Sequence, residues 1–71
     1  MEPPEITIQL NGQPRVIPAG SSVTALLAEL GMAGQPVLVE LNGMALFPRD
    51  FPGTIFQTGD AVEIIRIVAG G

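Results

Sequence analysis

The sequence lacks several of the residue types that most often carry chemistry in proteins. It contains no cysteine, histidine, tryptophan or tyrosine. The absence of cysteine excludes disulfide bonds, thiolate metal sites and a thiol nucleophile. The absence of histidine removes the commonest general base and the commonest metal ligand. Without these groups, we expect the chain to have no active site of its own.

Positive charge is also scarce. Three basic residues, all of them arginine, stand against seven acidic ones, and the formal net charge is −4. An acidic chain without lysine lacks the basic surface that nucleic acids and anionic membranes require, so we expect neither partner. The first residues show no targeting pattern, and no apolar run approaches the length of a membrane span, so we expect a cytoplasmic location.

The first part of the chain predicts a hairpin and a helix. With 71 residues, 46% of them hydrophobic, the chain has room for one domain, residues 1–71. Alternating apolar residues predict a strand over 5–10, Asn11-Gly12 predicts a tight turn, and two prolines make the returning strand 13–18 an edge strand. Ser22 is the expected N-cap of the helix. The apolar stripe of that helix consists of Val23, Leu26, Leu27 and Leu30.

The second part predicts another hairpin and a final strand. Residues 37–41 and 44–47 flank a second Asn-Gly turn, and two prolines make 48–53 an irregular segment. Residues 61–68 form the longest strand candidate, and its many β-branched residues favour a central place between the hairpins, parallel to the first strand. This order predicts an α+β fold of the β-grasp type: a mixed sheet of four to five strands with one main helix packed on one face.

Two glutamates indicate which side chains point away from the helix. Glu63 is disfavoured in a core, so Ile65 and Ile67, at the same strand parity, are expected to point outward with it. Glu40 implies the same for Leu38. An exposed apolar patch beside two acids is typical of a docking surface. The plain alternative is ordinary surface, because single exposed apolar residues are common.

Two further features are awkward or ambiguous in this pattern. Arg66 shares its parity with core residues, so either its stem lies along the sheet with the guanidinium in water, or a bulge shifts the register there. The three phenylalanines are expected to anchor the core or the loops. They are Phe47, Phe51 and Phe56.

The sequence ends in Ala69-Gly70-Gly71, directly after the last predicted strand. Glycine has no Cβ, so a double-glycine end can enter a narrow channel and leaves its carboxylate open to attack on a nucleotide phosphate. We therefore expect residues 69–71 to form a flexible tail with Gly71 as the group that partner enzymes modify. The alternative is a frayed end without function.

Short motifs spread from Ile6 to Gly71 match one known family. They are Leu10-Asn11-Gly12, Gly20-Ser21-Ser22-Val23 with Leu26-Leu27 and Leu30, Val39-Glu40-Leu41-Asn42-Gly43, Phe47-Pro48-Arg49, Gly59-Asp60 and Ile67-Val68-Ala69-Gly70-Gly71. In this order and spacing they make the sequence resemble the ThiS family, the ubiquitin-like sulfur carrier proteins of thiamine biosynthesis. Met44 departs from the family pattern, because this position is often polar there.

The resemblance implies a carrier that binds no cofactor and is acted on by other proteins. A ThiF-like adenylating enzyme would use ATP and Mg²⁺ to adenylate the Gly71 carboxylate. A cysteine desulfurase or a rhodanese-like protein would supply sulfur, and the resulting thiocarboxylate would serve a ThiG-like thiazole synthase. The resemblance also implies docking roles for Ile65 and Ile67, a docking or loop-fixing role for Arg49, and a free carrier that is monomeric.

Two other classes of function stay open at this point. One is a carrier for another pathway, such as the small subunit of molybdopterin synthase. That family also ends in Gly-Gly, but it tends to have proline and serine where this chain has Ile67-Val68-Ala69. The other is a β-grasp binding module, or a modifier that is joined to lysine side chains of other proteins.

Overall fold

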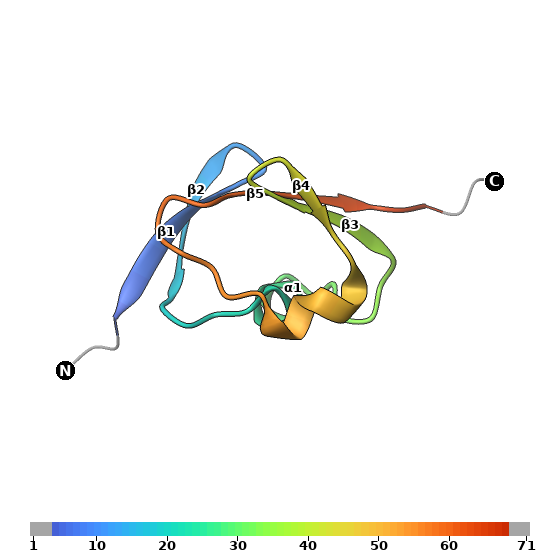
Figure 1. Cartoon of the computed structure of the whole chain (residues 1–71), viewed down its shortest axis with the longest axis horizontal. Coiled ribbons are helices and arrows are strands. Elements are labelled where there is room, and N and C mark those ends of the chain that lie inside the picture. The colour runs from blue at the N-terminus through green and yellow to red at the C-terminus, as the bar shows by residue number, and fades with distance from the viewer. Residues whose placement is uncertain (1–3, 69–71) are drawn as a thin grey trace.

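The strands form one mixed sheet with both helices on one side of it. The computed structural model describes residues 4–68 (Figure 1). Its elements are β1 (Glu5–Leu10), β2 (Gln13–Pro18), α1 (Val23–Glu29), β3 (Val37–Leu41), β4 (Met44–Leu46), the 3₁₀ helix η1 (Pro48–Gly53) and β5 (Ala61–Arg66). The five strands are ordered β2-β1-β5-β3-β4. The predicted β-grasp fold, with β2 at an edge, is confirmed.

The last strand holds the two hairpins together. β5 runs parallel to β1 and antiparallel to β3, so it occupies the central position that its β-branched residues predict. Val62 and Ile64 point into the core, whereas the alternate residues Ala61, Glu63 and Ile65 are exposed. Since β5 pairs with β1 on one edge and with β3 on the other, it joins the two hairpins into one sheet.

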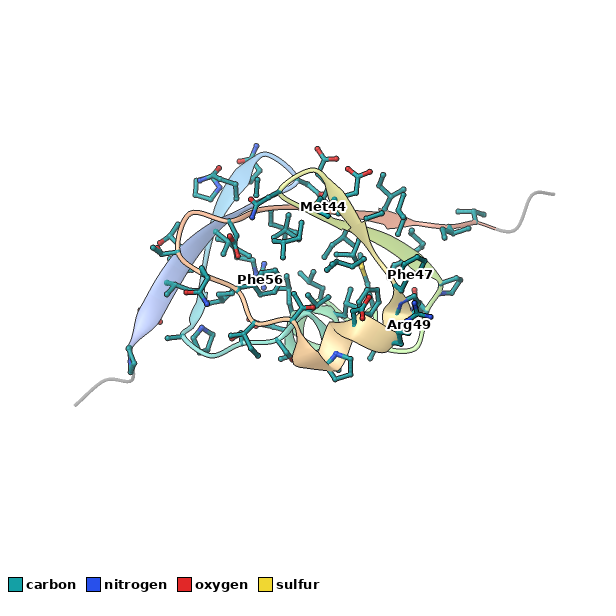
Figure 2. The ribbon with its side chains drawn as sticks, in the orientation of Figure 1. Met44, Phe47, Arg49 and Phe56 are labelled. Atoms are coloured by element: carbon teal, nitrogen blue, oxygen red, sulfur yellow. The ribbon has the colours of Figure 1, made fainter. Side chains whose placement is uncertain are left out.

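The core lies between the sheet and α1. The Oγ of Ser22 accepts a hydrogen bond from the backbone N–H of Ala25 at 3.1 Å, which confirms the predicted N-cap. The helix buries the side chains of Val23, Leu26 and Leu27. The other buried residues are Ile8, Ile17, Val39, Phe51, Phe56, Val62 and Ile64. Phe56 is only 2% exposed and lies near the middle of the molecule (Figure 2).

Two local predictions need correction, and the structure decides between the two alternatives for Arg66. The segment expected to be irregular is the 3₁₀ helix Pro48–Gly53, because proline is favourable in a first helical turn and Phe51 anchors the turn in the core. β5 ends at Arg66 rather than continuing to Val68, and Val68 is 78% exposed. The β3–β5 register continues without a bulge to the pair Val37↔Arg66, and Arg66 is exposed there at the end of the strand.

The two asparagines of the hairpin turns also bind the central strand. Both have a positive φ of 50°. The Asn11 Oδ1 accepts a hydrogen bond from the Ile64 N–H at 2.9 Å, and its Nδ2 donates to the Ile64 carbonyl at 3.4 Å. On the other side, the Asn42 Oδ1 accepts from the Ala61 N–H at 2.9 Å, and its Nδ2 donates to Asp60 Oδ1 at 3.0 Å. Each turn therefore fixes β5 as well as closing its own hairpin.

Candidate functional site: the outer sheet face and the base of the tail

The face of the sheet that α1 does not cover carries an apolar pair beside an acidic pair. Leu38 of β3 lies directly opposite Ile65 of β5. Two residues away along each strand, on the same face, Glu40 lies opposite Glu63. Leu38 is 37% exposed and Ile65 is 50% exposed, as the strand parity predicts. Opposed carboxylates repel each other across a sheet, so a basic group placed between them by a partner would be favourable.

An exposed aromatic side chain follows the second hairpin. Phe47 comes directly after β4, whose last pair with β3 is Val39↔Leu46. Phe47 is 60% exposed, so the expectation that it anchors the core was wrong; β4 ends just before it, and Phe51 is buried in the core instead. The Arg49 guanidinium carbon lies 4.8 Å from the centre of the Phe47 ring, a cation–π distance (Figure 2). The Arg49 side chain therefore packs against the ring of Phe47.

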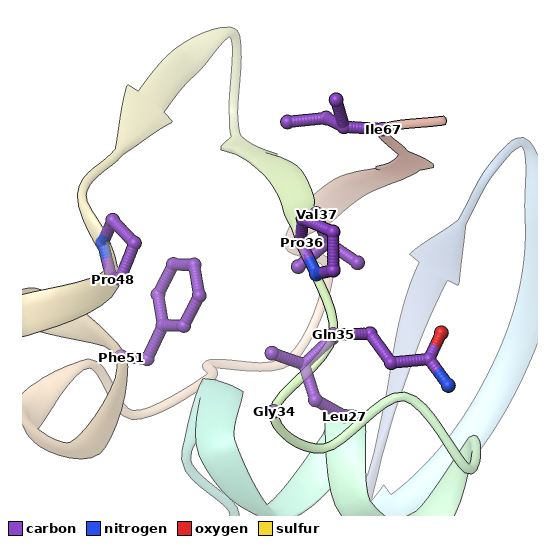
Figure 3. A pocket seen from close by; sticks show the side chains of 8 residues that line it. All are labelled: Leu27, Gly34, Gln35, Pro36, Val37, Pro48, Phe51 and Ile67. Carbon is purple, nitrogen blue, oxygen red and sulfur yellow. The ribbon is translucent and has the colours of Figure 1, made fainter. Parts of the chain in front are cut away.

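A shallow apolar pocket lies at the same end of the sheet. Its volume is about 390 Å³, and the residues lining it include Leu27, Pro36, Val37, Pro48, Phe51 and Ile67 (Figure 3). We expected Ile67 on the outer face beside Ile65. The structure places it among the residues that line the pocket, just beyond the end of β5. Ile67 is 53% exposed, and its N–H donates to the Pro36 carbonyl at 3.0 Å.

These features surround the base of the tail. Ile67 and Val68 are the last residues that the structure describes; the predicted tail residues Ala69, Gly70 and Gly71 lie outside them. The predicted docking residues Leu38, Ile65, Glu40 and Glu63 share one face. Arg49 stacks on Phe47, just beyond the end of β4. Their docking role stays a prediction. What the structure establishes is that apolar side chains are exposed where the tail begins.

Among residues 4–68, no three histidine, cysteine, aspartate or glutamate side chains come together in a way that could hold a metal ion. Asp60 is engaged within the fold, since its carboxylate accepts hydrogen bonds from Asn42 Nδ2 and from the Gln57 N–H. The helices in that part of the chain are also too short to span a membrane.

Sequence reasoning missed the pocket and the exposure of Phe47. Both depend on the path of the chain between β4 and Phe51, which a segment with two prolines does not reveal by periodicity. Some signal was present, because prolines end strands: Pro36 lies just before β3 and Pro48 just after β4. The pocket opens between these two ends, beside Ile67.

The comparisons with known proteins agree on one family. The model of the ThiS family matches residues 8–71. A sulfur carrier protein ThiS from Thermus thermophilus is 33% identical over 64 residues, which cover 90% of this chain and 98% of that protein. A crystal structure of the thiamine biosynthesis protein ThiS from Geobacter metallireducens superposes with a TM-score of 0.79 at 36% identity. The match covers 93% of this chain and all of that one.

A longer relative is also similar. A thiazole synthase from Magnetococcus marinus is 33% identical over 64 residues, which cover 90% of this chain. This stretch is only 20% of that protein, so the chain spans about a fifth of its length. That thiazole synthase therefore contains a segment similar to this chain as one part of its polypeptide.

Proposed function

Because the chain belongs to the ThiS family of sulfur carriers in thiamine biosynthesis, we propose that its Gly71 carboxylate is converted to a thiocarboxylate that donates sulfur for thiazole formation. The observation that carries the proposal is the family match over residues 8–71, which includes the Gly-Gly end. The chain itself would be no enzyme; it would present one reactive group to its partners.

The chemistry explains why the carrier needs an activating enzyme. A carboxylate is a poor electrophile, because its negative charge is delocalised over both oxygens. A ThiF-like enzyme with bound ATP and Mg²⁺ would let a Gly71 oxygen attack the α-phosphate, and pyrophosphate would leave. The outer sulfur of a persulfide on a cysteine desulfurase or a rhodanese-like donor would then attack the acyl-adenylate and displace AMP, which leaves an acyl disulfide. A second thiol would cleave that disulfide, releasing the Gly71 thiocarboxylate and ending in a disulfide with the donor cysteine. No group of this chain would take part except the terminal carboxylate.

The surface at the base of the tail supports a docking role. Leu38, Ile65 and Phe47 expose apolar area that a partner would remove from water, and removing apolar surface from water is favourable. Glu40 and Glu63 would select a partner with a basic side chain beside its apolar contact. Thiazole synthase is one such partner, and its pairing with a carrier-like segment within one relative supports this assignment.

Intact-mass spectrometry tests the chemistry. The protein ending at Gly71 is co-expressed with the adenylating enzyme and sulfur donor of the same organism. A mass increase equal to the replacement of one oxygen by sulfur, located at Gly71, is expected. A variant with one alanine added after Gly71 should show no increase while keeping its circular dichroism spectrum, because the added side chain blocks the end. Full conversion of that variant would refute the role of Gly71.

A matched pair of substitutions tests the docking face. Ile65→Asp should weaken binding to thiazole synthase by about tenfold or more, since it places a charge in a desolvated contact. Val16→Asp is the control: Val16 is 56% exposed on the same face but lies on β2, the far edge strand. Isothermal titration calorimetry measures both. Equal losses for the two variants would show that the site lies elsewhere.

A further inference from the structure

The edge of β5 that faces β1 is paired over only part of its length. β1 pairs with β5 at Gln9↔Ala61 and Leu10↔Val62 and then turns away into its hairpin. The side-chain amide of Asn11 carries the pairing one step further, since it bonds both the N–H and the carbonyl of Ile64. Within residues 4–68, no other strand pairs with this edge beyond Ile64.

Strand geometry shows which backbone groups point to this edge. The backbone groups of alternate residues point to opposite sides of a strand. Ala61 and Ile67 bond toward β3, through Asn42 and Pro36, whereas Val62 and Ile64 bond toward β1, through Asn11. Arg66 follows Ile64 in the second series, so its N–H and carbonyl face the side where the described chain provides no partner strand. An exposed edge with a free donor and a free acceptor is a template for an added strand.

The charge at this edge selects the kind of strand that fits. Arg15 forms an ion pair with Glu29 at 3.2 Å, and Arg49 stacks on Phe47. Within the described part of the chain, Arg66 has neither kind of contact. A second copy of this chain, paired edge to edge about Arg66, would bring two guanidinium groups opposite each other, and like charges in that position are unfavourable. A strand with a carboxylate there is favoured instead.

We propose that thiazole synthase adds an extended segment to this edge of β5, bonding the N–H and carbonyl of Arg66 and placing a carboxylate opposite its guanidinium. The proposal rests on the proposed function. Strand addition supplies affinity through main-chain hydrogen bonds and fixes the direction of the bound chain. Here it would lengthen the sheet at the base of the tail. Residues 67 and 68 would then be held extended, so that the following residues are aimed into the partner.

Two substitutions at one position separate the backbone contact from the charge. Arg66→Pro removes the edge-facing N–H without removing a hydrogen bond of the fold, and proline is tolerated at strand edges of this kind. Arg66→Gln removes the charge but keeps the N–H. With thiazole synthase of the same organism, calorimetry should show about tenfold weaker binding for Arg66→Pro and a smaller loss for Arg66→Gln. Thermal unfolding of both variants should match that of the unmodified protein.

Hydrogen exchange on the unmodified protein gives a second readout and decides the matter if Arg66→Pro does not fold. The Arg66 amide should exchange fast in the free carrier and slowly in the complex. The Ile67 amide, bonded to Pro36 in the fold, is the internal reference. Unchanged Arg66 exchange on binding, or full affinity of a folded Arg66→Pro variant, would overturn the proposal. A failure of the unmodified carrier to bind thiazole synthase would overturn it as well. The proposed function is tested separately, by the formation of the thiocarboxylate.

Discussion

The two halves of β5 are held in different ways. The first half, from Ala61 to Ile64, is bonded on both edges: β1 and Asn11 lie on one side, β3 and Asn42 on the other. The second half keeps only β3, through Leu38↔Ile65 and Val37↔Arg66. The anchored half buries Val62 and Ile64, whereas all residues from Ile65 to Val68 are exposed. A single strand thus changes from core to surface within a few residues.

This contrast shows how a small domain can expose apolar side chains at one end of a strand without giving up buried contacts. Within β5, the buried side chains are confined to the anchored half. The exposed half has apolar side chains in water, an edge without a partner strand in the described residues, and the exposed Arg66. All of these lie just before residues 69–71. Contacts that a partner makes there need not compete with contacts of the core.

The largest effect should come from truncating neighbouring isoleucines, one in each half. Ile64 is 6% exposed, and Ile64→Ala should lower the free energy of unfolding by about 2–5 kcal/mol, because it leaves a cavity in the core. Ile65 is 50% exposed, and Ile65→Ala should change the free energy of unfolding by less than about 0.5 kcal/mol. Urea unfolding measures both. Similar losses for the two would show that the halves are not distinct.

An intermediate effect is expected from the asparagine that carries the β1 side of the pairing. Asn11→Gly keeps a residue that accepts positive φ but deletes both side-chain bonds to Ile64, which should cost about 1–3 kcal/mol of stability. Asn42→Gly is the matched variant on the β3 side. Amide exchange should accelerate at Ile64 in the first variant and at Ala61 in the second. Acceleration at neither amide would mean that the turns do not fix β5.

The smallest effect concerns the opposed carboxylates on the outer face. Glu63→Gln should raise the free energy of unfolding by about 0.2–1 kcal/mol, because it removes the repulsion from Glu40. The gain should shrink as salt is added, since salt screens exposed charges. Glu5→Gln is the control, as Glu5 is exposed and faces Pro18 across the sheet. A loss of stability in Glu63→Gln would show that the carboxylate makes a favourable contact in the free protein.

The local signals predict most of the fold. Both Asn-Gly turns, the Ser22 cap and the alternation in β1 and β5 depend on neighbours in the chain. Each is found where its pattern indicates, except that β5 ends at Arg66 rather than Val68. The central place of β5 also follows, because a strand rich in β-branched residues needs cover on its edges. The exposure of Leu38 and Ile65 follows from the parity set by two glutamates.

Other features were decided only when distant segments came together. The sequence determined that Asn11 and Asn42 stand in turns, but their bonds to β5 exist only because the last strand inserts between the hairpins. Likewise, the end of β5 at Arg66, the pocket at Ile67 and the exposed Phe47 depend on where neighbouring segments stop. Periodicity reports which face a side chain takes along its own strand; it carries no information on which backbone lies next to it.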